Sequence, residues 1–107
     1  ALQIRRLLLN RVNDRLTIPE VARELHVSPT LAKTVFRKTY GCGIMAYFNE
    51  LKIWQSKRML GNPSMTIDQI SRTLGFSSPA YFTRTFRKLT GVTPSDFRSK
   101  RGQTGIC

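Results

Sequence analysis

The stretch LTIPEVARELHVS at residues 16–28 returns as MTIDQISRTLGFS at residues 65–77. The two segments align at an offset of 49, and the identical pairs are Thr17 with Thr66, Ile18 with Ile67, Arg23 with Arg72, Leu25 with Leu74, and Ser28 with Ser77. After one inserted residue the register resumes at an offset of 50, with VFRKTYG at 35–41 opposite TFRKLTG at 85–91. This internal repeat predicts two structural units of the same kind.

Each copy carries the signals of a first short helix. Thr17 with Glu20, and Thr66 with Gln69, have the spacing of capping boxes, in which the two side chains satisfy free N–H groups of the first helical turn. Apolar residues then follow at helical spacing, namely Ile18, Val21, Ala22 and Leu25 in the first copy and Ile67, Ile70 and Leu74 in the second. Both helices are too short to be stable alone and must pack against other elements.

A second helix follows a short break in each copy. Ser28-Pro29 and Ser78-Pro79 supply an N-cap and a proline at the first helical position, where the missing N–H costs nothing. Both helices end at a glycine, Gly41 and Gly91. In the break, Gly75 stands where a positive φ is usual and His26 holds the equivalent place, so we expect His26 to be a turn residue rather than a metal ligand. Helix, turn and helix, found twice, predict two helix-turn-helix units.

The segment between the two copies is compatible with one uninterrupted helix from Ile44 to Leu60, ended by Gly61-Asn62-Pro63. Its apolar residues lie on more than one face, so we expect a connector against which both small units pack. We expect Trp54 to pack there rather than to stack on a base. The sequence therefore predicts an all-α fold with a first unit at 1–43, a connector at 44–61 and a second unit at 62–101.

Further helices are predicted at the two ends of the chain. Ile4, Leu8 and Val12 recur at four-residue steps and predict a helix that covers the first unit. Thr93-Pro94 repeats the pattern of cap and proline and begins a short final helix. Residues 102–107 show no pattern and are expected to form a disordered tail.

Composition excludes several classes of function. The 107 residues include 18 Lys+Arg against 6 Asp+Glu, a formal net charge of +12, and both halves of the chain share the excess. A folded surface with that charge is typical of a polyanion-binding protein. Apolar runs such as Leu7–Leu9 are far too short to cross a membrane. Two distant cysteines, one histidine and scattered carboxylates form no metal, cofactor or catalytic motif, so we expect no enzyme, no cofactor and a reducing, cytoplasmic location.

The stretch LGFSSPAYFTRTFRKLTGVTPSDFR at residues 74–98 resembles the signature of the AraC/XylS family of bacterial transcription regulators. That signature has Gly-Phe, an aromatic-Phe pair, Arg-x-Phe-basic-Lys, Gly-x-Ser/Thr-Pro and a final aromatic-Arg. The resemblance covers about residues 5–101. It departs from the family at Lys52 and Ser56, where Arg and Ala are usual, and at Leu31-Ala32. It implies two recognition helices that enter successive major grooves of double-stranded DNA.

The candidate contact residues lie on the two second helices of the repeat. Phe82 and Phe86, like Ala32 and Phe36, are expected to be buried, which leaves the opposite face for DNA. The face and the family pattern together assign base contacts to Thr30, Lys33, Thr34, Pro79, Ala80, Thr83 and Arg84. Arg84 is the strongest candidate, because a guanidinium can donate two hydrogen bonds to guanine, while Pro79 and Ala80 can touch a thymine methyl. Contacts to the DNA backbone are assigned to Thr17, Arg37, Lys38, Thr66, Arg87 and Lys88.

Two further expectations concern partners. The chain begins at Ala1, so we expect it to be part of a longer protein with an N-terminal effector or dimerisation domain, acting at the bacterial nucleoid. RNA polymerase is an expected second partner. The alternative function is a docking module for RNA polymerase or for a partner domain, with only weak, non-specific binding to DNA. RNA-binding modules and interfacial membrane helices have patterns that this sequence lacks.

Overall fold

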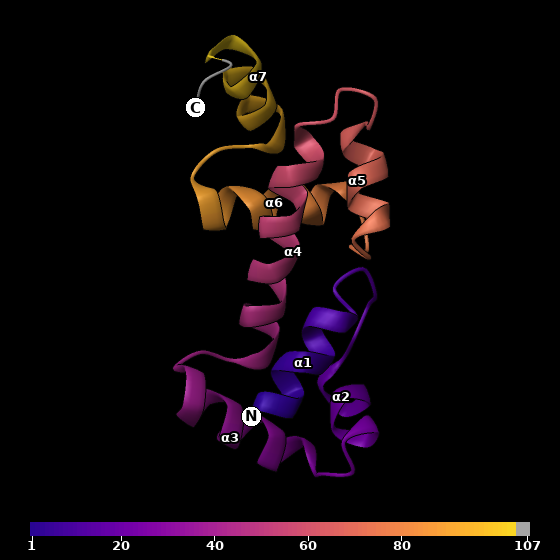
Figure 1. Cartoon of the computed structure of the whole chain (residues 1–107), viewed down its shortest axis with the longest axis vertical. Coiled ribbons are helices and arrows are strands. Elements are labelled where there is room, and N and C mark those ends of the chain that lie inside the picture. The colour runs from indigo at the N-terminus through magenta and orange to yellow at the C-terminus, as the bar shows by residue number, and fades with distance from the viewer. Residues whose placement is uncertain (105–107) are drawn as a thin grey trace. The chain divides into compact units, whose positions relative to one another are not determined.

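The structure is a computed structural model that describes residues 1–104, with the side chains of residues 1–99. The described residues form seven helices and no strand: α1 (Leu2–Asn10), α2 (Ile18–Glu24), α3 (Pro29–Tyr40), α4 (Ile44–Leu60), α5 (Ile67–Thr73), α6 (Pro79–Thr90) and α7 (Pro94–Thr104) (Figure 1). The chain divides into one compact unit from Ala1 to Leu51 and a second that begins at Lys52. The division falls inside α4, so each unit contains part of the connector. The all-α fold with two helix-turn-helix units and a long connector is confirmed.

The first unit has its own apolar core. α2 and α3 pack against each other, and α1 and the first half of α4 complete the unit. The buried residues of this core are Ile4, Leu8, Leu16, Val21, Ala22, Ala32, Phe36, Ile44 and Phe48. Phe36 also contacts the rings of Tyr40 and Tyr47, with centroids 4.7 and 5.3 Å away. These contacts fix the inner face of α3.

The second unit repeats this plan with larger side chains. α5 packs against α6, and α6 packs against α7. Its buried core consists of Ile53, Leu60, Ile70, Leu74, Phe76, Phe82 and Phe86. Phe82 lies between Phe76 and Phe86, with ring centroids 5.1 and 5.9 Å away, and so occupies the space that the first unit leaves to Ala32.

The predicted ends of the repeated helices are confirmed. Both capping boxes are formed. The Thr17 hydroxyl accepts a hydrogen bond from the backbone N–H of Glu20, and the Thr66 hydroxyl accepts one from the backbone N–H of Gln69. Pro29 and Pro79 begin α3 and α6, and both helices end at a left-handed glycine, with φ of 79° at Gly41 and 86° at Gly91. These local signals set the length of α3 and of α6 at 12 residues each.

The two turns have the same backbone geometry at their start. His26 adopts φ of 58° and Gly75 φ of 77°, which confirms His26 as a turn residue. In both units the next amide donates back to the helix, from Val27 to the Ala22 carbonyl and from Phe76 to the Ser71 carbonyl, the pattern of a Schellman motif. The second turn, 74–78, has one residue more than the first, 25–28, and this is the inserted residue of the repeat.

Three features differ from the sequence-based expectations. α1 ends at Asn10, so Val12 lies beyond it. α7 continues to Thr104, so the first half of the expected tail is helical, and residues 105–107 lie outside the described part of the chain. Trp54 does not pack: 60% of its surface is exposed, and the Arg58 guanidinium lies over its ring at 5.5 Å from the centroid. The apolar residues of α4 wrap around the helix, and periodicity could not tell which side stays uncovered.

Candidate nucleic-acid interface

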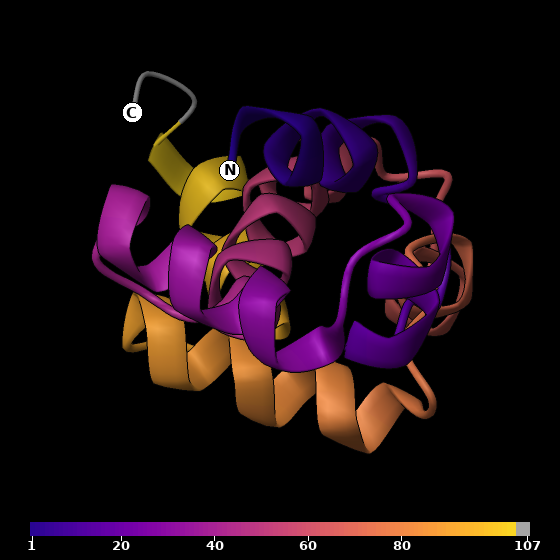
Figure 2. The same cartoon turned by 90° about the horizontal axis from the view of Figure 1, so that it is seen from below.

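α3 and α6 each bury one side in their own unit and leave the other side exposed. The buried positions are Ala32 and Phe36 in α3 and Phe82, Thr85 and Phe86 in α6. Figure 2 views the molecule from below and shows α3 along its length, with the turn from α2 at its N-terminal end. Neither helix contains an acidic residue, whereas each contains three basic ones: Lys33, Arg37 and Lys38, and Arg84, Arg87 and Lys88. The outer faces of both helices therefore carry positive charge and no negative charge.

The structure places the candidate base-contact residues on these outer faces. Thr30, Lys33 and Thr34 are exposed on α3, and Pro79, Ala80 and Arg84 are exposed on α6. Thr83 is half-buried. The Ser28 hydroxyl accepts from the Leu31 amide at 3.0 Å, and the Ser78 hydroxyl from the Tyr81 amide at 3.1 Å. These caps satisfy donors of the first turn and so fix the backbone from which the outer side chains project.

The candidate phosphate contacts fall into two groups. Arg37, Lys38, Arg87 and Lys88 are all exposed in the last turns of α3 and α6, near the negative end of each helix. Thr17 and Thr66 are exposed as well, but their amides already donate within the capping boxes, to the Glu20 carboxylate at 3.3 Å and to the Gln69 amide oxygen at 2.8 Å. The capping partner of Thr66 is therefore neutral and that of Thr17 is charged, although Asp68 also places a carboxylate in the first turn of α5.

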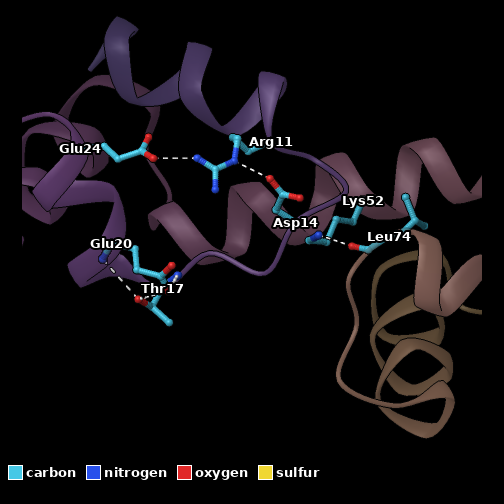
Figure 3. Close-up of polar contacts among 7 residues, drawn as sticks. All are labelled: Arg11, Asp14, Thr17, Glu20, Glu24, Lys52 and Leu74. Carbon is cyan, nitrogen blue, oxygen red and sulfur yellow. Dashed lines mark hydrogen bonds and ion pairs between the residues drawn. The ribbon is translucent and has the colours of Figure 1, made fainter.

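Several acidic side chains of the chain are held by arginines away from α3 and α6. Arg11 donates from Nε to Asp14 and from Nη1 to Glu24, the second contact at 2.7 Å (Figure 3). These hydrogen bonds, to Asp14 first and Glu24 second, raise the pKa of the Arg11 guanidinium above its ordinary value. Asp68 pairs with Arg72 on α5 at 3.0 Å. These arginines thus partly neutralise the carboxylates that they contact. Within α3 and α6 themselves, no carboxylate offsets the positive charge of the outer faces.

Two cations hold elements of the second unit together and were missed as functional candidates. Lys52 is only 4% exposed, and its ammonium group donates to the carbonyl of Leu74, the residue that ends α5 (Figure 3). The same ammonium lies 5.8 Å from the centre of the Phe76 ring. Lys52 therefore ties α4 to the turn that leads into α6. The departure from the family pattern at this position was the signal that could have marked it.

Arg98 holds the other end of the same unit. Its guanidinium on α7 donates to three backbone carbonyls, of Leu60 at 3.2 Å, Met65 at 2.6 Å and Asn62 at 3.3 Å. It thus satisfies the last turn of α4 and the loop before α5. The final Arg of the 74–98 stretch carries this contact.

Sequence reasoning also passed over two large apolar residues on the outer faces. Leu31 is 50% exposed on α3, and Tyr81 holds the equivalent place on α6 and is exposed too. Leu31 directly precedes the buried Ala32, and Tyr81 directly precedes the buried Phe82. Because both are large, apolar and adjacent to core positions, sequence reasoning easily assigns them to the core. Tyr81 leans on its own unit through the Phe76 ring, at 5.8 Å between centroids. The first turn of α3, which contains Leu31, buries only Ala32.

The described part of the chain offers no other obvious site. It brings no three His, Cys, Asp or Glu side chains together where they could hold a metal ion. None of its helices combines the length and apolar character that crossing a membrane requires. The two outer faces remain as the candidate interface.

Residues 21–100 match a family model described as a helix-turn-helix domain. The chain belongs to the AraC/XylS family of transcription regulators. It is 34% identical over 82 residues to the arabinose operon regulatory protein of Salmonella typhimurium, an alignment that covers 77% of this chain and 29% of that protein. The chain thus spans less than a third of the length of the arabinose regulators that it matches.

Solved structures of AraC/XylS type have the same fold. An AraC-type regulator from Chromobacterium violaceum superposes with a TM-score of 0.83 at 26% identity, over 95% of this chain and 91% of that one. The DNA-binding domain of AdpA, solved in complex with a target DNA, superposes with a TM-score of 0.90 at 19% identity, over 99% and 96% of the two chains. The second likeness concerns the fold alone.

Proposed function

We propose that this chain binds double-stranded DNA in a sequence-specific way, as the DNA-binding part of a transcription regulator. The carrying observation is that each helix-turn-helix unit presents a capped recognition helix, α3 or α6, with a buried inner side and an acid-free, cationic outer side. A helix of this kind fits the major groove, where its outer side chains reach base edges. Membership of the AraC/XylS family supports the proposal, and the formal charge of +12 favours a polyanion.

The roles of the outer residues follow from their chemistry. We assign base contacts to Thr30, Lys33, Thr34, Pro79, Ala80, Thr83 and Arg84. Arg84 matches guanine, since its fork can donate to both O6 and N7. We assign phosphate contacts to Arg37, Lys38, Arg87 and Lys88, and to the helix starts at Thr17 and Thr66. Each of these starts also holds a carboxylate in its first turn, Glu20 in α2 and Asp68 in α5, and Asp68 is paired with Arg72.

A salt titration of duplex binding tests the electrostatic part of this proposal. If about 6 to 10 phosphates are neutralised, the logarithm of the affinity falls with the logarithm of salt concentration at a slope of about −0.9 per contact. The comparison of a selected duplex with a scrambled one of the same composition tests specificity. A flat titration, or equal affinity for the two duplexes, contradicts the proposal.

The exposed Trp54 favours a second role as a contact with a protein partner. A tryptophan stacked with an arginine at the surface is the kind of pair that dominates protein interfaces, and this pair lies on α4 rather than on a recognition helix. We propose RNA polymerase as the partner that contacts Trp54. In the alternative function, docking to such a partner is the main role of the chain and DNA binding is weak. Trp54→Ala should leave duplex affinity unchanged and lower polymerase recruitment. Loss of duplex affinity instead would assign Trp54 to the DNA.

The remaining expectations concern the whole regulator. Because the aligned segment covers only 29% and 28% of two relatives, we propose that an effector or dimerisation domain accompanies this segment. We propose that the protein acts in the cytoplasm, at the nucleoid, and that this segment has no catalytic role. Purification of the full-length protein and measurement of its oligomeric state with and without this segment test the first point.

A further inference from the structure

The two recognition helices offer different chemistry at equivalent positions. At the offset of 50 that aligns the second helices of the repeat, Thr30 corresponds to Ala80, Leu31 to Tyr81 and Thr34 to Arg84. α6 thus places a guanidinium where α3 places a threonine. At this position the two helices offer different chemistry to a base, because a threonine lacks the planar fork that matches guanine.

Three side chains of α3 form an exposed group that we name the methyl triad: Thr30, Leu31 and Thr34. Thr34 is four residues after Thr30 and three after Leu31, so it neighbours both on the helix surface. All three are exposed, with half of the Leu31 surface open to solvent. The cap from Ser28 to the Leu31 amide fixes the backbone, and burial of Ala32 and Phe36 keeps the triad on the outside.

The methyl triad presents methyl groups beside two hydroxyls and carries no charge. Residues 29–36 contain no Arg, Asn, Gln, Asp or Glu, so Lys33 is the one charged side chain in the first two turns of α3. In the major groove the C5-methyl group of thymine is the apolar feature of the bases, and aliphatic side chains recognise it. A phosphate-binding or amide-binding surface would not place an exposed leucine at its centre.

We infer that α3 reads a thymine-rich half-site through the methyl triad, with Leu31 as a specificity-determining residue, while α6 reads a half-site that contains guanine through Arg84. This inference rests on the proposed function and names the sequence class of its target. The full site is therefore asymmetric, and its two halves respond to different chemical changes in the bases.

Base analogues test the inference on a duplex selected by this chain from a random pool. Uracil in place of thymine keeps base pairing and removes the C5-methyl group, and 7-deazaguanine removes the N7 acceptor. Each methyl group lost from the thymine-rich half should weaken binding about fourfold, the equivalent of about 0.8 kcal/mol. Leu31→Ala should reduce that penalty to below about twofold, because the contact is already missing. The 7-deazaguanine penalty in the other half should survive Leu31→Ala and disappear in Arg84→Ala.

Two further variants accompany Leu31→Ala, the first as a control and the second as an additional test of the methyl triad. Leu9→Ala removes an exposed leucine of α1 in the same unit and should keep the full uracil penalty. Thr34→Ser keeps the hydroxyl, removes a methyl group and should lower the penalty. Selective binding without any uracil penalty, or a penalty that Leu31→Ala leaves unchanged, overturns this inference alone. Failure to select any preferred duplex overturns the proposed function and the inference together.

Discussion

Arg84 and Lys88 are exposed one turn apart on α6, and their positions predict different losses. Arg84 lies in the second turn of α6, closer to the N-terminal end whose side chains reach base edges, whereas Lys88 lies in the last turn. Arg84→Ala should cost about 1 to 3 kcal/mol on the preferred duplex and relax preference at one base pair. Lys88→Ala should weaken all duplexes alike and reduce the salt slope by about one. Competition titrations at several salt concentrations measure both effects, and an Arg84→Ala variant with unchanged affinity and preference would remove α6 as a recognition helix.

Ser71 is a polar residue at a core position where the first copy of the repeat has alanine. It corresponds to Ala22, and both positions are fully buried or nearly so, at 0% and 1% exposed. Among the described residues, the Ser71 hydroxyl is a buried polar group without a hydrogen-bond partner. Ser71→Ala should therefore stabilise the protein by about 1 kcal/mol in urea unfolding.

The reciprocal change supplies the control. Ala22→Ser places the same hydroxyl at the matched position of the first unit and should destabilise the protein by about 1 to 3 kcal/mol. A Ser71→Ala variant that is less stable than the parent would show that the hydroxyl has a partner in solution.

At the scale of elements, the position of α6 depends on the residues beneath it. Phe86 is fully buried among Phe82 and Phe97, with ring centroids 5.9 and 5.6 Å away. Phe86→Ala should cost about 3 to 5 kcal/mol, because it leaves a cavity that rigid neighbours cannot fill. Circular dichroism in urea should show the helices of the second unit unfolding first, with the DNA contacts of that unit lost as a consequence. Phe36→Ala is the matched change in the first unit and should unfold the helices of that unit first. If Phe86→Ala and Phe36→Ala unfolded the same helices first, the assignment of Phe86 to the core of the second unit would be wrong.

Lys52 makes the turn before α6 depend on α4. Lys52→Met keeps the length of the side chain but leaves the Leu74 carbonyl without this donor, so it should lower the free energy of unfolding by about 1 to 3 kcal/mol. Amide exchange at Gly75 and Phe76, which donate to α5, should accelerate. Lys52→Arg, which restores a cationic donor, should retain most of the stability. An undisturbed turn in Lys52→Met would show that the lysine does not hold it.

At the scale of the whole molecule, each unit has its own core and its own recognition helix. We therefore predict that a monomer protects two patches of the major groove in one site, about one helical turn or roughly 34 Å apart. Hydroxyl-radical and methylation footprinting measure the patches, and Phe86→Ala should remove one and keep the other. A single short patch for the intact chain would contradict the prediction, as would a strict requirement for palindromic dimer sites.

The sequence by itself determined where the helices of the repeat begin and end. Thr17, Ser28 and Gly41, with their counterparts in the second copy, act through contacts within a few residues, and such contacts hardly depend on the rest of the fold. The same holds for the left-handed turn at His26. The outer faces of α3 and α6 could also be derived, because Phe36, Phe82 and Phe86 mark the inner faces at helical spacing.

Only the tertiary structure decided which residues of the connector are covered and which are open. A lysine is buried at position 52 and a tryptophan is exposed at position 54, the reverse of what the two side chains favour in isolation. Lys52 is held by a carbonyl that is 22 residues away in sequence, and Trp54 lies on the side of α4 that its unit leaves uncovered. Burial depends on what packs from distant parts of the chain. Helical periodicity shows which residues share a face of α4. It does not show which other elements pack against that face.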